Sequence, residues 1–178
     1  MLKDKDHSLL RDNTFRIDQK CDEYVAFANE GEAIDLAMNL KEPFLLLGGG
    51  SNLLLTTDFP GMVVTPEKRF DIAVELRQGC DDPYLRCWAG TTFDDVVDYA
   101  VRHGYHGLEN LSLIPGECGA SAIQNIGAYG AEIKDVMLEV EAVEIGTGRV
   151  VRLRAEDCGY GYRQSKFKNE WKNRYIVV

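Results

Sequence analysis

The sequence predicts a mixed α+β fold, and three observations support this prediction. The first 66 residues read as a strand, a helix and further strands, which is the pattern of a β-α-β-β unit. A second amphipathic helix begins near residue 92, and residues 136–153 read as a β-hairpin. With 178 residues, of which 45% are hydrophobic, the chain can bury a normal core.

The first unit is expected to follow a charged, loosely held segment at residues 1–12. Its helix, residues 32–40, places alanine and leucine at helical spacing along one face. Residues 44–47 form a short and fully apolar run, which is typical of a buried strand. The expected strands of this unit are residues 24–28, 44–47, 53–55 and 62–64.

The second unit is expected to hold a strand pair, a helix and a hairpin. Thr92 opens the helix, Asp95 follows at the spacing of a capping box, and Gly104 ends it. The chain closes on a strand pattern where a polar end is more usual, so we expect it to be part of a longer protein. The expected strands are residues 71–76, 84–89, 136–145, 149–153 and 174–178.

The composition excludes several classes of protein. The net charge is −9 and no cluster of Lys and Arg stands out, so a nucleic-acid partner is not expected. No apolar run reaches membrane-spanning length, and none near the start is typical of a signal peptide. The cysteines form no C-x-x-C pair, which favours a reducing, cytoplasmic setting without a disulfide framework or a metal site. They are Cys21, Cys80, Cys87, Cys118 and Cys158.

Residues 48–52, Gly-Gly-Gly-Ser-Asn, lie between two apolar strand patterns. Three glycines in a row allow consecutive N–H groups to point at one anion, such as a pyrophosphate. A tight hairpin loop would explain the same residues. A P-loop is excluded because no Gly-Lys-Ser/Thr follows, and a strand in place of a helix disfavours the Rossmann fingerprint.

Residues 115–132 form a second glycine-rich segment with almost no charge. Glycine permits positive φ and lets a ligand lie against the main chain. Ser121, Gln124 and Asn125 add hydrogen-bonding groups that suit the edge of a flat heterocycle. An irregular structural loop is the other interpretation. Two such segments in one short chain suggest one extended ligand held from two sides.

Tyr162 and Arg163 lie in a further loop between glycines and lysines. A planar guanidinium there can grip a carboxylate, although a surface ion pair is the commoner role of such an arginine. The three histidines lie outside the glycine loops and form no metal set.

The order of these motifs closely resembles that of the UDP-N-acetylenolpyruvoylglucosamine reductases, flavoenzymes of bacterial peptidoglycan synthesis. The resemblance covers nearly the whole chain from about residue 10. One departure is Ala122, where many relatives carry proline. The matching pieces are Asn13-Thr14-Phe15 and the segments 47–52, 107–111, 114–116, 124–130 and 161–168.

The resemblance implies the two-subdomain FAD-binding fold of the vanillyl-alcohol oxidase and p-cresol methylhydroxylase type. Residues 1–66 would form the first subdomain, incomplete on its own, and residues 67–178 the second. The FAD would be non-covalent, because no histidine occupies the loops. The implied cofactor-binding residues are Gly48, Gly49, Gly50, Ser51, Asn52, Ile114, Pro115, Gly116, Ser121, Gln124, Asn125, Gly127, Ala128 and Tyr129.

The implied reaction is the NADPH-driven reduction of UDP-N-acetylglucosamine enolpyruvate to UDP-N-acetylmuramate in cell wall biogenesis. Arg163 matches the catalytic arginine of the family, and Tyr162 matches its active-site neighbour. Arg163 would stabilise the negative charge that develops beside the substrate carboxylate.

Family members continue into a substrate-binding domain that is absent from this chain, so the chain alone is expected to be inactive. Two alternatives stay open. One is another FAD-dependent oxidase or dehydrogenase of the same fold, and the other is a non-catalytic flavin-binding module.

Overall fold

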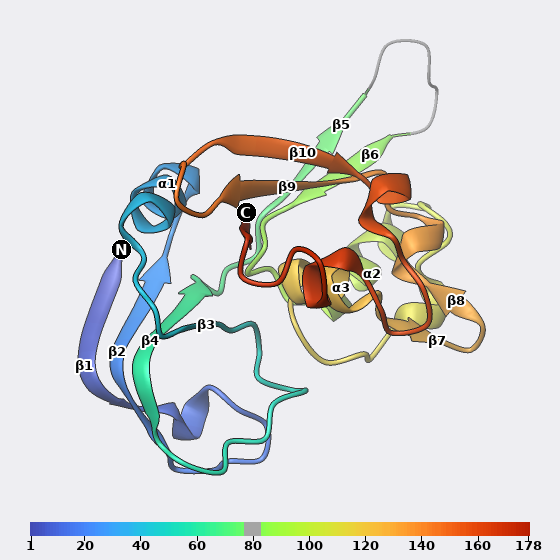
Figure 1. Ribbon diagram of the computed structural model, residues 1–178. Helices are drawn as coiled ribbons and strands as arrows, with labels where there is room; N and C mark the ends of the chain where they lie inside the picture. Colours follow the sequence, from blue (N-terminus) through green and yellow to red (C-terminus); the bar gives the residue numbers. More distant parts are fainter. Residues whose placement is uncertain (77–82) are drawn as a thin grey trace.

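The computed structural model describes residues 1–76 and 83–178, and Cys80 lies outside that range. The first sheet consists, in pairing order, of β1 (Leu2–Ser8), β2 (Lys20–Phe27), β4 (Phe59–Pro66) and β3 (Phe44–Leu46) (Figure 1). β1 is antiparallel to β2, whereas β2 and β3 both run parallel to β4. Helix α1 (Glu30–Asn39) connects β2 to β3, which is how a chain returns to start a strand in the same direction.

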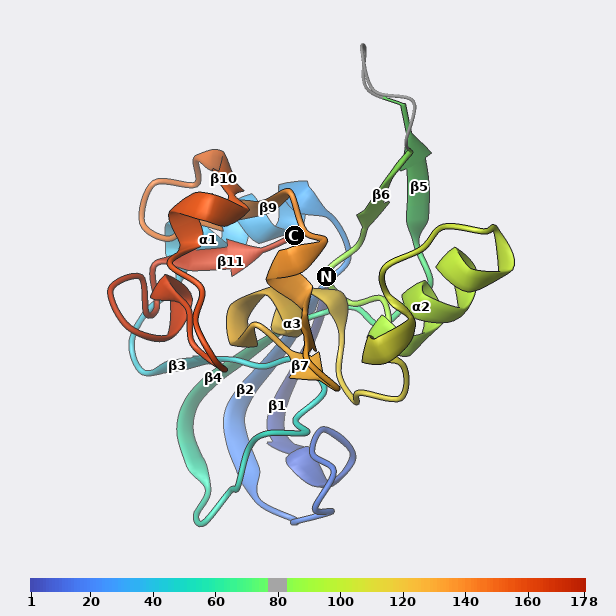
Figure 2. The same ribbon diagram turned by 90° about the vertical axis from the view of Figure 1, so that its right-hand side faces the viewer.

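The second sheet is a three-stranded antiparallel sheet in the order β10-β9-β11. A separate hairpin, β5 with β6, projects from the body of the molecule (Figures 1 and 2). A shorter one, β7 with β8, lies within the second glycine-rich segment. These strands are β5 (Ile72–Glu75), β6 (Tyr84–Cys87), β7 (Gly127–Ala128), β8 (Ala131–Glu132), β9 (Glu139–Glu144), β10 (Val150–Arg154) and β11 (Tyr175–Val177).

Helix α1 lies between the two sheets and joins their cores. Gly146, in the turn of the β9–β10 hairpin, donates its N–H to the Ala37 carbonyl at 2.8 Å. A side chain at Gly148 would meet Met38 of α1 at 2.7 Å. Burial of each large apolar side chain in this core contributes about 1.5–3 kcal/mol. The buried cluster comprises Val25, Phe27, Ala33, Leu36, Ala37, Val64, Val143 and Ile176.

Both expected helices are present, but their starts differ in chemistry. The Asn29 side chain caps α1 by accepting from the Glu32 N–H at 2.9 Å. Helix α2 (Phe93–Arg102) follows Thr92, whose side chain makes no capping bond, so the predicted capping box is wrong. At the first helical residue, the Phe93 N–H donates to the Gly116 carbonyl at 2.9 Å.

Three further expectations are corrected. Residues 1–12, expected to be loose, form β1 and a 3₁₀ turn, because pairing with β2 orders a strand whose exposed side chains show no apolar alternation. Residues 53–55 form no strand, although Leu55 is buried against the first sheet. Segment 115–132 is not one irregular loop but contains helix α3 (Cys118–Gln124). The 3₁₀ turns are Leu9–Arg11, Glu109–Leu111, Ile133–Asp135, Ala155–Cys158 and Lys166–Lys168.

The other expected strands are confirmed with shifted ends. The last of them is β11, which pairs with β9. The first sheet is built entirely before residue 67, yet its core continues through α1 into the second sheet. A division into subdomains at residue 66 therefore stays a prediction. Within the described ranges, no helix has the length and apolarity needed to span a bilayer.

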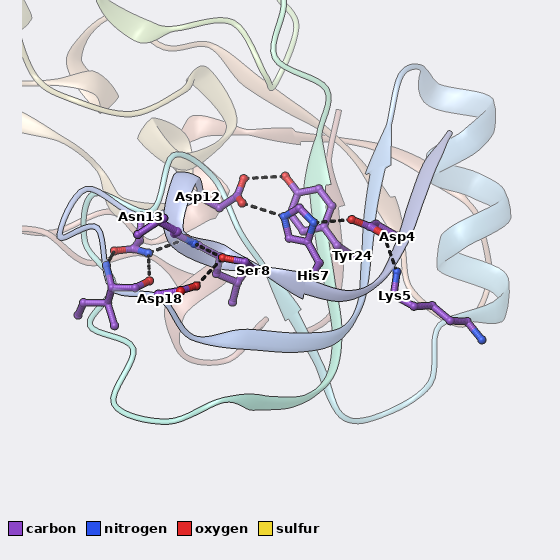
Figure 3. Close-up of polar contacts among 11 residues, drawn as sticks. Asp4, Lys5, His7, Ser8, Asp12, Asn13, Asp18 and Tyr24 are labelled. Atoms are coloured by element: carbon purple, nitrogen blue, oxygen red, sulfur yellow. Dashed lines mark hydrogen bonds and ion pairs between the residues drawn. The ribbon is translucent and has the colours of Figure 1, made fainter.

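A polar cluster fastens the segment between β1 and β2 (Figure 3). The His7 imidazole lies between two carboxylates, with Nδ1 2.9 Å from Asp4 and Nε2 3.0 Å from Asp12. The Tyr24 hydroxyl donates to the other oxygen of Asp12 at 2.9 Å, and its ring stacks on His7. Asn13 holds the same segment by donating to the Leu9 and Ile17 carbonyls.

We predict that His7→Gln lowers the melting temperature more at pH 6 than at pH 9. Burial lowers the pKa of His7, but the hydrogen bonds to Asp4 and Asp12 outweigh it and raise the pKa above its ordinary value. A raised pKa stabilises the fold fully below about pH 6.5, and the gain is lost as pH rises through the folded pKa. For a partly exposed group the expected difference is roughly 1–3 °C.

Circular dichroism melts of wild type and variant at both pH values test this prediction. His106→Gln serves as the control, because the side chain of His106 is 85% exposed. An equal loss at pH 6 and pH 9 for His7→Gln would contradict the role of the imidazolium.

Candidate functional site

The structure brings the two glycine-rich segments together. The Ser51 hydroxyl donates to the Pro115 carbonyl at 3.3 Å. The Asn52 amide donates to the Gln124 side-chain oxygen at 2.9 Å. Helix α3 therefore lies directly against the loop that follows β3 (Figure 2). The expectation that both segments border one site agrees with these contacts.

Close packing explains why residues 48–50 are glycines. Gly50 has a φ of +64°, and a Cβ there would lie 2.0 Å from the Asp12 carbonyl oxygen. A Cβ at Gly48 would lie 2.9 Å from the Ala120 Cβ. A Cβ at Gly49 would lie 2.9 Å from the carboxylate oxygens of Glu117. Any side chain would therefore force the loop away from α3 or from the segment behind it.

The amide N–H groups of residues 48–52 are not used within the described part of the fold. In the described chain none of them donates a hydrogen bond to a protein acceptor. Their neighbour Glu117 is only 6% exposed, and its Oε2 has no hydrogen-bond partner. Its Oε1 lies 3.7 Å from the Lys68 ammonium. Unpaired polar groups of this kind are costly and call for a partner.

A cavity of about 210 Å³ lies beside this loop. It is bounded by residues 45–53, by one face of α3 and by β11. A second cavity, of about 300 Å³, lies against the opposite face of α3 and is lined by Ser121. The Ser121 hydroxyl donates to the Cys118 carbonyl at 2.7 Å within α3, so this predicted ligand residue faces away from the glycine loop.

Asn125 is predicted to hydrogen-bond to the edge of a ligand. It is fully buried, and its side-chain amide makes hydrogen bonds to backbone groups. Its Nδ2 donates to the Gly161 carbonyl at 2.8 Å, and its Oδ1 accepts from the Lys134 N–H at 3.2 Å. It stands at the C-cap of α3 with a φ of +48°. This geometry makes Asn125 a positioning residue that ties α3 to the loop of Tyr162 and Arg163, and its binding of cofactor stays a prediction.

Tyr162 and Arg163 form the tip of a tight turn. Gly161 and Gln164 close this turn through two backbone hydrogen bonds of 3.1 and 3.0 Å. Tyr162 is 81% exposed, and the Arg163 guanidinium lies 5.9 Å from its ring centroid. No ion pair with Arg163 occurs within the described residues, so its charge is free to meet a ligand. Buried Ser165 supports the turn by donating to the Ile123 carbonyl at 2.5 Å.

The remaining predicted residues surround the same region. Ile114 packs in a core with α2, and Gly116 adopts a φ of +124° next to the Ser51 hydroxyl. Gly127 and Ala128 form the half-buried strand β7, which leads to the exposed Tyr129.

Left-handed backbone conformations concentrate here. Seven non-glycine residues of the described chain have positive φ; three of them belong to these segments, and a fourth directly precedes residues 114–116. Such conformations cost of order 1–3 kcal/mol each and gather at functional sites. The four are Leu113, Asn125, Tyr129 and Arg163.

Sequence reasoning missed Glu117 and Lys68. The available signal was that Glu117 is the single charge between residues 115 and 131, in a segment otherwise without charge. Lys68 carries no comparable signal, because it lies in an ordinary charged stretch after β4. No group of three or more metal-binding side chains occurs among the residues with described positions.

The model of a protein family described as the FAD binding domain matches residues 29–154. That match takes in more than half of the chain, and the chain belongs to the FAD binding domain family. The unpaired amides beside α3 fit this assignment, because FAD carries a diphosphate. The expected α+β FAD-binding fold and the expected cofactor are confirmed at this level.

Within this family, the similarity is to the UDP-N-acetylenolpyruvoylglucosamine reductases. The reductase of Bacteroides fragilis is 43% identical over 174 residues, which cover 97% of this chain and 51% of that protein. The Escherichia coli K12 reductase is 41% identical, with coverage of 97% and 50%. The crystal structure of the Thermus caldophilus reductase matches with a TM-score of 0.75 at 25% identity, covering 99% of this chain and 59% of that one. The resemblance read from the motifs is thereby confirmed, and the chain spans about half the length of the curated relatives it matches.

We predict that Gly50→Ala costs about 3 kcal/mol or more of unfolding free energy, since it adds a backbone clash to a left-handed φ. Gly104→Ala is the matched control, because Gly104 has a φ of +73° with no atom within 4 Å of a built Cβ. It should cost about 1 kcal/mol. Urea unfolding of both variants measures the difference, and equal costs would disprove the close approach to Asp12.

Proposed function

We propose that this chain is the FAD-binding part of a UDP-N-acetylenolpyruvoylglucosamine reductase that uses NADPH. The observation that carries the proposal is the row of unpaired amides at residues 48–52, whose loop is held by one side-chain hydrogen bond to Pro115 and one to Gln124 of α3. Consecutive main-chain amides of this kind can bind a diphosphate where few cationic side chains lie nearby. The substrate would be UDP-N-acetylglucosamine enolpyruvate, and the setting cytoplasmic peptidoglycan synthesis.

In this proposal the two glycine-rich segments hold FAD without a covalent bond. The amides of residues 48–52 face the diphosphate, and the segments 114–116 and 124–129 border the rest of the cofactor. Bound FAD supplies hydride transfer between NADPH and the enolpyruvyl group. The protein's part is to bind and orient the cofactor and to place charge near the reacting carbons.

The surroundings of Arg163 support its proposed role. Its guanidinium contacts the Tyr162 ring and is engaged in no ion pair within the described part of the chain. A fixed cation beside the substrate carboxylate would stabilise the negative charge that builds up there during reduction. The turn that carries both residues is joined to α3 through the hydrogen bond from Asn125 to the Gly161 carbonyl.

We predict that the purified chain, supplied with FAD, shows a flavin absorption spectrum. Acid precipitation should release all the chromophore into the supernatant, because no covalent attachment is expected. A coloured pellet would contradict non-covalent binding. Absence of a protein-bound flavin spectrum at saturating FAD would contradict the cofactor assignment for this chain.

We predict that Arg163→Ala lowers turnover about 100-fold or more in the protein that carries this chain with the remaining half of its relatives' length. FAD content and flavin reduction by NADPH should be unchanged, while reoxidation by the enolpyruvyl substrate slows in stopped-flow measurements. Arg102→Ala is the control, since Arg102 is an exposed arginine on α2. Normal reoxidation in Arg163→Ala would exclude the catalytic role and favour a non-catalytic or different flavoprotein.

A further inference from the structure

Hydrogen-bond donors without acceptors and an acceptor without a donor lie close together in the candidate site. The amides of residues 48–52 lack acceptors within the described chain. The Oε2 atom of Glu117 accepts no hydrogen bond from the described residues, although Glu117 is only 6% exposed. A buried carboxylate oxygen without a donor costs more than almost any other unpaired group. We therefore expect one ligand to hydrogen-bond both to the loop amides and to the Glu117 carboxylate.

The Glu117 carboxylate lies against the loop rather than pointing away from it. Built Cβ atoms at Gly48 and Gly49 would lie 3.0 and 2.9 Å from its Oε2. Its main chain is fixed, because the Glu117 carbonyl accepts the Ser121 N–H at the start of α3. Lys68 faces only the other oxygen, at 3.7 Å, and the lysine side chain is 55% exposed. The lysine therefore offsets part of the charge without satisfying Oε2.

The unpaired amides and the unpaired carboxylate oxygen together restrict which chemical groups the ligand can carry. The free amides favour an anion, whereas the carboxylate repels an anion and needs a neutral or cationic donor. A sugar phosphate carries both groups within a few bonds, since hydroxyls flank its phosphate. Carboxylates hold sugar hydroxyls in this way in dinucleotide-binding folds of other architecture.

We propose that Glu117 accepts a hydrogen bond from a sugar hydroxyl of the bound dinucleotide, on its ribose or on its ribityl chain. The proposal rests on the FAD site proposed above and adds a specificity-determining residue to it. Glu117 then selects for the hydroxyls that adjoin the diphosphate, while the loop amides select for the diphosphate.

Titration of the chain with FAD, followed by quenching of flavin fluorescence, tests the proposal. Glu117→Met keeps the length of the side chain but removes the acceptor, and should raise the Kd about tenfold. Glu117→Gln keeps an acceptor oxygen and should retain most of the affinity. Glu170→Gln, which removes a negative charge at an exposed position, should leave the Kd unchanged. Equal or tighter binding by Glu117→Met would overturn the proposal.

Two smaller ligands locate the hydroxyl. ADP carries the ribose and FMN the ribityl chain, so Glu117→Met should weaken one of them and spare the other. A variant that binds ADP and FMN as wild type does would also overturn the proposal.

Thermal melts without ligand separate this role from a structural one. Glu117→Met removes a buried carboxylate oxygen that has no donor in the described chain, together with a 3.7 Å ion pair to a half-exposed lysine, so its melting temperature should equal or exceed that of wild type. A clear fall would show that the carboxylate serves the fold and would overturn the proposal. If wild type itself binds no FAD, the proposed function fails, and this inference fails with it. If wild type binds FAD and Glu117→Met binds it equally well, the role of Glu117 alone fails.

Discussion

The contact of residues 48–52 with helix α3 and the residue before it leaves no room for side chains at Gly48 and Gly49, and much of the surrounding structure maintains it. On one side the carbonyl of Asp12 approaches Gly50 closely. On the other side Ala120 and Glu117 approach Gly48 and Gly49. The polar cluster of His7, Asp12 and Tyr24 holds the first of these neighbours, and the packing of α3 holds the second. Residues at the N-terminus of the chain therefore take part in shaping a site formed much later in the sequence.

This arrangement changes how the glycine run is understood. In the sequence the three glycines suggest a ligand, because glycine permits a close approach to the main chain. In the structure protein atoms make that close approach, and the ligand argument comes from the amides that remain unpaired afterwards. The tight hairpin raised as the other interpretation is wrong, because residues 48–52 connect strands β3 and β4, which run parallel. The anion nest stays a prediction.

Periodicity predicted most elements of the fold, because α1, α2 and the buried strands carry regular apolar patterns. It failed for β1, where strand pairing orders a segment whose side chains are almost all exposed. It also failed for residues 53–55, where Leu55 is buried and Leu54 is exposed but no strand pairing forms. Helix α3 was missed because its glycine and small residues give no apolar stripe, and tertiary contacts stabilise it. Composition could place a site at both glycine-rich segments, yet it could not show that Asn125 faces the backbone or that Glu117 is left without a donor.

Helix α3 also acts as a spacer of fixed length. One of its faces meets the glycine loop, and its end is joined through Asn125 to the turn that carries Arg163. An α-helix advances about 1.5 Å and rotates about 100° with each residue. Seven residues therefore define both the distance and the direction from the glycine loop to the turn that carries Arg163. Inserting or deleting one residue would leave the groups at each end chemically intact but would change the direction in which they point, so the length of α3 is as much a part of this candidate site as its side chains.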